Sequence, residues 1–159
     1  MLSRMIIAFI LTTAATAASL AARDTWRSCA IVGDSIAVET AQYLRDCKLN
    51  AKIGIPSGAV IARVDPQADI NFVSAGSNDP EEPNLRANLE RIRERAKRTI
   101  WILPAIPSAR AAVREIAAKH GDVVVSFAPG GDGVHPASAS ALAQAISTAI
   151  ASSTGDAGG

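Results

Sequence analysis

Aromatic residues and net charge are both scarce in this chain of 159 residues. Only 4% of the residues are aromatic, and alanine is abundant, which suits helices packed closely on a sheet better than a β-sandwich. The 16 basic residues nearly balance the 15 acidic ones, for a formal net charge of +1 at pH 7. Because nucleic-acid binding requires a concentrated basic surface, the composition argues against a nucleic acid as the main partner.

Long hydrophobic runs are also missing, and no stretch is long enough to cross a membrane comfortably. At the N-terminus, Arg4 precedes the apolar run 5–11, which gives way to small residues. This order predicts a secretory signal peptide over 1–22, cleaved near Ala21 or Ala22. An uncleaved membrane anchor is the alternative. The pattern favours an exported protein, periplasmic or extracellular, with no stable membrane span after processing.

The remaining chain is short enough to form one domain, which we expect over 23–152. The Gly/Ser-rich end, 153–159, is expected to be a disordered tail. The oligomeric state is not predicted by any feature of the sequence.

Cysteine is rare, with two residues in the chain. In an exported protein an even count favours a disulfide, and Cys29 and Cys47 would approach each other because a helix returns antiparallel to its strand. A pair of buried free thiols is the alternative. Neither cysteine neighbours a histidine, which leaves a cysteine nucleophile or a metal site without support. His120 ends a predicted helix before a glycine and has no partner in sequence.

Short apolar runs alternate with longer amphipathic segments from residue 29 onward, which predicts strands that alternate with helices. The expected strands are 30–32, 52–55, 70–75, 99–103 and 123–127. The expected helical segments are 36–47, 59–64, 85–98, 109–120 and 137–151. Right-handed crossovers between such strands produce a three-layer α/β/α sandwich with about five parallel strands flanked by helices.

Polar or glycine positions follow several of these strands. Ser35 follows the first strand, Gly58 lies beyond the second, Asn78 follows the third and His135 follows the last. Because the carboxyl ends of parallel strands meet at one edge of the sheet, we expect these positions to converge there.

A serine that attacks an acyl carbonyl needs a base, an orienting acid and donors for the oxyanion. His135 is a suitable base, and Asp132 lies close enough on a turn to hold its tautomer. The amides of Ser35 and Gly58 and the side chain of Asn78 are candidate oxyanion donors. As alternatives, Ser35 and Asn78 would merely cap the segments after their strands. The serine lies outside a Gly-x-Ser-x-Gly elbow, which argues against an α/β-hydrolase.

These motifs, taken together, resemble the SGNH (GDSL) hydrolase family. The matching blocks, in the family's order, are Gly33-Asp34-Ser35, Gly58, Gly76-Ser77-Asn78-Asp79 and Asp132-Gly133-Val134-His135-Pro136. The resemblance implies a flavodoxin-like fold, Ser35 as nucleophile, His135 as base and Asp132 as its partner. It also implies that Gly58 and Asn78 complete the oxyanion hole. No metal or organic cofactor is implied.

The second block departs from the family's pattern. The family often shows an Asn-x-Gly-x-Ser-Gly-like run, whereas this chain has Ile-Gly-Ile-Pro-Ser-Gly over 53–58. Gly58 matches best because it follows a serine, but Gly54 competes with it as the donor.

The chain lacks a segment long enough to form a lid or a separate binding domain. An open site suits a small acyl group on a large or soluble scaffold better than a long chain in a tunnel. We therefore expect a serine esterase that acts on small acyl esters, chiefly O-acetyl groups of carbohydrate or peptidoglycan. The alternatives are a lysophospholipase or thioesterase of the same fold and a non-catalytic carbohydrate-binding domain.

Overall fold

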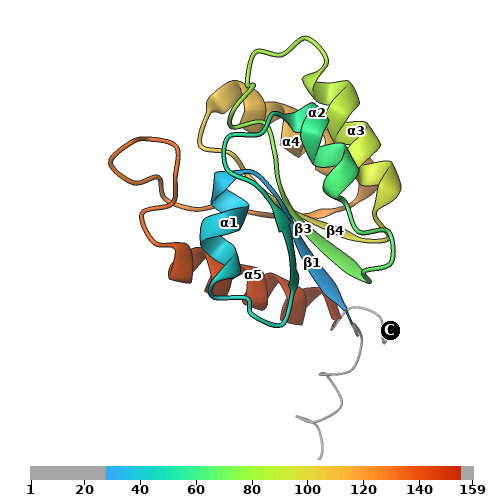
Figure 1. Cartoon of the computed structure of the whole chain (residues 1–159), viewed down its shortest axis with the longest axis vertical. Coiled ribbons are helices and arrows are strands. Elements are labelled where there is room, and N and C mark those ends of the chain that lie inside the picture. The colour runs from blue at the N-terminus through green and yellow to red at the C-terminus, as the bar shows by residue number, and fades with distance from the viewer. Residues whose placement is uncertain (1–27, 155–159) are drawn as a thin grey trace, which may run out of the picture.

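The computed structural model describes residues 28–154 and contains one five-stranded parallel sheet (Figure 1). The strands are β1 (Cys29–Gly33), β2 (Lys48–Ala51), β3 (Ile70–Ser74), β4 (Thr99–Ile102) and β5 (Val123–Val125). The helices are α1 (Ser35–Ala41), α2 (Ser57–Val60), the 3-10 turn η2 (Ile61–Arg63), α3 (Leu85–Arg95), α4 (Pro107–His120) and α5 (Ala139–Thr154). The strand order β2-β1-β3-β4-β5 is the flavodoxin-like order, so the expected fold is confirmed.

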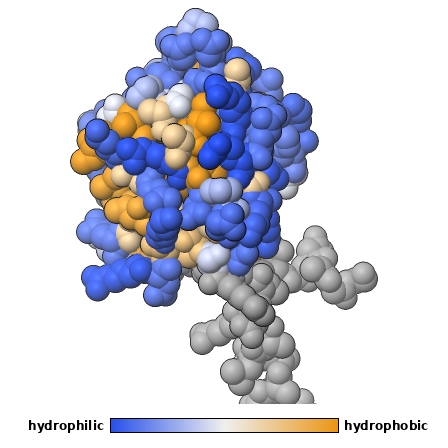
Figure 2. Space-filling view, turned by 45° about the vertical axis from the view of Figure 1, so that its right-hand side comes forward, coloured by the Kyte–Doolittle hydropathy of each residue, from blue (hydrophilic) through white to orange (hydrophobic). Residues whose placement is uncertain are grey.

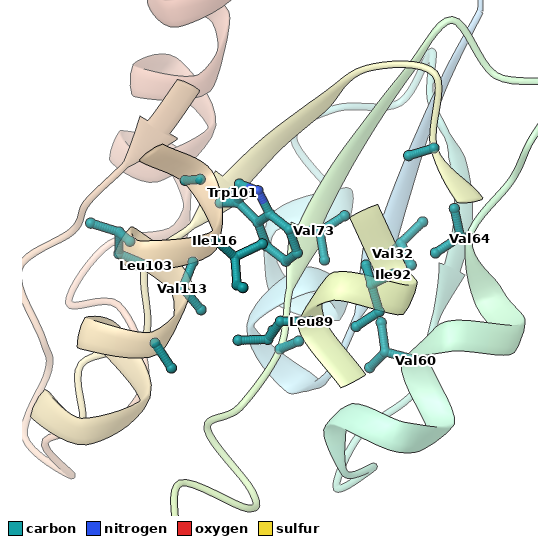
Figure 3. Packing of buried hydrophobic residues seen from close by; sticks show 14 of the residues in the cluster. Val32, Val60, Val64, Val73, Leu89, Ile92, Trp101, Leu103, Val113 and Ile116 are labelled. Carbon is teal, nitrogen blue, oxygen red and sulfur yellow. The ribbon is translucent and has the colours of Figure 1, made fainter. Parts of the chain in front are cut away.

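Helices cover both faces of the sheet and bury alternate residues of the central strands on each face. Helices α1 and α5 lie on one face, and α2, α3 and α4 lie on the other (Figure 1). On the α3 side, Val32, Val73 and Trp101 pack against helix residues such as Leu89 (Figure 3). The opposite side chains of the same strands, such as Phe72, pack under α1 and α5. The three central strands are buried throughout, which explains why their residues are mostly apolar.

The first helix and the second strand differ from the prediction. Helix α1 ends at Ala41, and the chain continues in tight turns that keep Leu44 partly buried. The second strand is β2, Lys48–Ala51, and the expected strand over 52–55 is wrong. Because β2 is an edge strand with half-exposed residues, it carries little apolar signal, whereas Ile53 is 68% exposed in the turn that follows.

The large exposed hydrophobic side chains lie at the two edges of the sheet. Within residues 28–154 they are Tyr43 in the turns after α1, Leu49 in β2, Ile53 in the turn after β2, and Val124 in β5. Figure 2 shows hydrophobic residues gathered on one side of a surface that is otherwise largely hydrophilic. No helix within the described residues is both long and apolar enough to span a bilayer.

The chain ends extend beyond the described residues. The predicted signal peptide, 1–22, lies outside them. Helix α5 continues to Thr154, which is two residues into the segment expected as a tail. The remainder of that segment, 155–159, also lies outside the described residues.

The predicted disulfide is confirmed. Cys29 at the start of β1 is bonded to Cys47, just before β2, with their Cα atoms 4.7 Å apart. The bond therefore joins the amino end of a central strand to the loop that leads into the edge strand. Ser35 lies beyond the other end of β1.

Loss of this disulfide should lower the free energy of unfolding. It should leave intact the edge of the sheet at the carboxyl end of β1, beyond which Ser35 lies. A Cys29→Ala/Cys47→Ala variant should lose about 3 kcal/mol of unfolding free energy, because the crosslink restricts the unfolded chain. Urea unfolding followed by circular dichroism measures this loss, and the reduced wild type is the matched control. An unchanged midpoint in both would contradict the prediction.

Candidate active site

The turn after β1 places Ser35 at the start of α1. Gly33 has a φ of +136°, and a side chain there would collide with the Ser74 carbonyl of the neighbouring strand, so glycine is required. Asp34 caps α1, since its Oδ1 accepts a hydrogen bond from the Ile36 amide at 3.1 Å. Ser35 is the first residue of α1. Because Asp34 supplies the cap, the alternative that Ser35 merely caps the helix does not hold.

Asp34 is anchored in the protein interior. The side chain is fully buried, and Oδ1 also accepts a hydrogen bond from the Ser74 hydroxyl at 2.8 Å. Burial raises the pKa of Asp34, and the hydrogen bonds from Ser74 and Ile36 oppose that rise. This support was not foreseen from the sequence, although an aspartate just before a helix is an N-cap signal.

Hydrogen bonds link Ser35, His135 and Asp132 in series. The Ser35 Oγ lies 2.8 Å from Nε2 of His135, a residue 100 positions away in sequence. The other ring nitrogen, Nδ1, lies 2.5 Å from Oδ2 of Asp132. The structure therefore brings together the three residues that the sequence singled out for acyl chemistry.

The Asp132 carboxylate also stabilises the loop that carries it. Its Oδ1 accepts hydrogen bonds from the Val134 amide at 2.9 Å and from the His135 amide at 3.0 Å. Oδ1 of Asp132 thus holds the backbone of the loop, while Oδ2 contacts the imidazole ring of His135. The two residues keep this geometry although the side chain of Asp132 is 54% exposed.

Backbone contacts close this loop at its base. Pro129 and Pro136 form an isolated antiparallel bridge, and the Gly130 amide donates to the His135 carbonyl at 2.7 Å. The loop, orange in Figure 1, leaves the sheet after β5 and returns to begin α5. The acid and the base are therefore held by a single braced peptide.

The loop contacts shift both ionisable groups toward their charged forms. Hydrogen bonds from the Val134 amide, the His135 ring and the His135 amide hold the pKa of Asp132 well below its usual range. The hydrogen bond to Asp132 raises the pKa of His135 above 6.5, opposed by partial burial and aided by nearby carboxylates. The imidazole is thus a stronger base than a free histidine.

The segment 76–79, which follows β3, is hydrogen-bonded to the segment 53–58. The side-chain amide of Asn78 donates one hydrogen bond to the Ile55 carbonyl at 3.0 Å. Oδ2 of Asp79 accepts from both the amide of Ser57 at 2.9 Å and its hydroxyl at 2.5 Å. Ser57 begins α2, so these contacts fix the first turn of that helix beside the end of β3.

Gly58 and Gly54 occupy different surroundings. Gly58 follows Ser57 in the first turn of α2, where amide groups lack intrahelical acceptors. Asn88 of α3 steadies this turn through a 3.0 Å hydrogen bond to the Ser57 hydroxyl. Gly54 lies in an exposed turn with a φ of +74°. The Asp79–Ser57 contact therefore braces Gly58 and not Gly54.

The second histidine is engaged elsewhere. His120 ends α4, and its Nε2 lies 2.7 Å from Glu90 of α3, a partner that the sequence did not reveal. No group of three or more His, Cys, Asp or Glu side chains within 28–154 is arranged to hold a metal ion.

Comparison with known proteins identifies a shared fold. No protein-family model and no curated protein matches the sequence. Among solved structures, the chain is similar to the C-terminal catalytic domain of peptidoglycan O-acetyltransferase A from Streptococcus pneumoniae, determined with a methylsulfonyl adduct. The TM-score is 0.60 at 17% identity, over 81% of this chain and 94% of that domain. The chain therefore has the fold of that domain, in agreement with the SGNH-like fold expected from its motifs.

Proposed function

We propose that this protein is a serine esterase that hydrolyses small acyl esters, chiefly O-acetyl groups on carbohydrate or peptidoglycan. The observation that carries the proposal is the series of hydrogen bonds from Ser35 through His135 to Asp132. A hydroxyl, an imidazole and a carboxylate in this order form the arrangement that activates a serine for attack on an acyl carbon.

The first step is attack by Ser35 Oγ on the ester carbonyl. As the new bond between Oγ and carbon forms, Nε2 of His135 takes the hydroxyl proton. Asp132 holds the proton on Nδ1 and stabilises the imidazolium that results. The raised pKa of His135 favours this transfer.

The carbonyl oxygen becomes an oxyanion in this step and needs donors. The proposed donors are the Ser35 and Gly58 amides, each in the first turn of a helix, and the side chain of Asn78. One N–H of the Asn78 amide is bound to the Ile55 carbonyl, which orients the group and leaves its second N–H for the substrate. Gly58 is preferred to Gly54 because Asp79 braces its turn.

Collapse of the tetrahedral intermediate breaks the bond between carbon and the leaving oxygen. His135 returns its proton to that oxygen, so that the alcohol leaves and the acyl group stays on Ser35. Water then attacks the acyl-enzyme, with His135 again acting as base. The products are a carboxylic acid, the alcohol and regenerated Ser35.

The accessibility of the site supports a small acyl group on a bulky scaffold. The side chains of Asp132 and His135 are 54% and 32% exposed. An exposed site admits a polymer that presents its ester at the surface, whereas long acyl chains require burial. The proposed location is outside the cytoplasm, which the Cys29–Cys47 disulfide supports. The proposed enzyme is the domain 23–152, after removal of 1–22.

Acyl transfer to a carbohydrate hydroxyl is a second candidate, favoured by the similarity to an O-acetyltransferase domain. Transfer and hydrolysis share the acyl-enzyme and differ only in whether a sugar hydroxyl or water attacks it. Accumulation of acetylated oligosaccharide, in place of free acetate, would identify the transfer reaction.

A series of p-nitrophenyl esters tests the proposed acyl specificity. We expect rapid release of p-nitrophenol from the acetate, slower release from the butyrate and none above background from the palmitate, because the exposed side chains of Asp132 and His135 leave a long acyl chain in contact with water. Steady-state kcat/KM for each ester measures this. A preference for the long chains would instead support the lysophospholipase or thioesterase alternative.

A further inference from the structure

Glu39 faces the same ring nitrogen of His135 as Ser35 does. It lies four residues after Ser35 on α1, a spacing that places the two side chains on one face of a helix. Its Oε1 is 3.9 Å from Nε2 of His135, and the Ser35 Oγ is 2.8 Å from that nitrogen. The reactions proposed above do not use Glu39.

The leaving group of the ester must come close to this carboxylate. In the proposed reaction the leaving oxygen takes its proton from Nε2 of His135, over a hydrogen bond of about 3 Å. That oxygen therefore lies within about 7 Å of the Glu39 carboxylate, whatever the orientation of the substrate. The alcohol part of the ester is therefore close enough to interact electrostatically with the Glu39 carboxylate.

The surroundings of His135 are rich in negative charge. Asp132 meets Nδ1, Glu39 faces Nε2 from α1, and buried Asp34 lies below the first turn of that helix. All three carboxylates act to raise the pKa of His135. Glu39 is 44% exposed, and in the described part of the chain its carboxylate has His135 as its ion-pair partner. Its charge is therefore available to an incoming alcohol group.

We propose that Glu39 is a specificity-determining residue for the alcohol part of the substrate. It favours alcohols that carry hydrogen-bond donors or positive charge near the ester and disfavours those that carry negative charge there. This inference rests on the proposed esterase function. It names the substrate class as esters of hydroxyl-rich or cationic alcohols, because a carboxylate accepts hydrogen bonds from such groups and repels anions.

Three aryl acetates of different charge test the inference: 4-acetoxybenzoate (anionic), its methyl ester (neutral) and 4-(trimethylammonio)phenyl acetate (cationic). The quantity measured is kcat/KM in Glu39→Gln relative to the wild type, which cancels the intrinsic reactivity of each ester. At low ionic strength we expect this ratio to rise about threefold for the anion and to fall about threefold for the cation, relative to the neutral ester. High salt should reduce both effects.

Matched variants separate charge from structure. Glu94→Gln removes the same charge from an exposed position on α3 and should leave all three ratios equal. Glu39→Asp keeps the charge and should retain the preference for the cationic ester. The imidazole of His135 should titrate at lower pH in Glu39→Gln, as measured by NMR, because the Glu39 carboxylate contributes to the raised pKa of His135.

The possible results test the role of Glu39 separately from the proposed esterase function. Turnover of all three esters with equal ratios in Glu39→Gln would overturn the role of Glu39 and leave the esterase proposal intact. Absence of turnover of any ester by the wild type would overturn the proposed function, and the specificity inference with it.

Discussion

Replacement of Ser35 by alanine should abolish turnover of p-nitrophenyl acetate, with a loss in kcat of about 10⁴-fold or more. The reason is that no other group in the hydrogen-bonded series can form the acyl-enzyme. Folding should be unaffected, because Asp34 and not Ser35 caps α1. The Ser35 hydroxyl makes its side-chain hydrogen bond with His135 alone among the described residues.

Two measurements check the Ser35→Ala result. A fluorophosphonate probe should label the wild type at Ser35, as located by mass spectrometry, and should not label the variant. Thermal unfolding of the variant should match that of the wild type. Retention of turnover by a folded Ser35→Ala protein would remove Ser35 as the nucleophile, and Asp34→Ala serves as a contrasting variant that should lose the helix cap.

Replacement of Asp132 by asparagine should lower kcat/KM by about 10²- to 10⁴-fold, the range expected for loss of an orienting acid. Oδ1 of the new side chain can still accept from the Val134 and His135 amides, so the loop should keep its shape. The amide group would donate to Nδ1 and force the ring proton onto Nε2, which then cannot accept the proton of Ser35.

The pH dependence of Asp132→Asn has a definite sign. His135 must be neutral to act as a base, and its pKa is raised above 6.5 chiefly by the hydrogen bond to Asp132. The acid limb of the wild-type kcat/KM profile should therefore lie at higher pH than for an ordinary histidine and should move to lower pH in the variant. Asp46→Asn, at an exposed position, is the matched control. An acid limb that stays in place would contradict the proposed coupling.

The fold was predictable because its central strands are buried on both faces. Strands β1, β3 and β4 are buried throughout and mostly apolar, and such runs are visible in a sequence without knowledge of their neighbours. The edge strand β2 lacks that constraint, since Lys48 and Leu49 are exposed, and it was therefore misplaced onto 52–55. Hydrogen bonds to β1, and not composition, define it.

The site was predictable where motif and topology agree, and unpredictable where a contact joins distant segments. Ser35, Asp132 and His135 follow strands of one parallel sheet, so their position at a common edge follows from the parallel direction of the strands. The contact between Ser57 and Asp79 joins positions 22 residues apart and has no local signal. The proximity of Glu39 to His135 likewise depends on how the last loop returns over α1.

The bridge between Pro129 and Pro136 has a consequence for how the proposed activity would be lost. Because the acid and the base are carried on one braced peptide, any outward movement of that peptide withdraws both from the nucleophile together. Such a movement does not pass through a stage in which His135 stays in place without Asp132. Activity would then be lost in a single step.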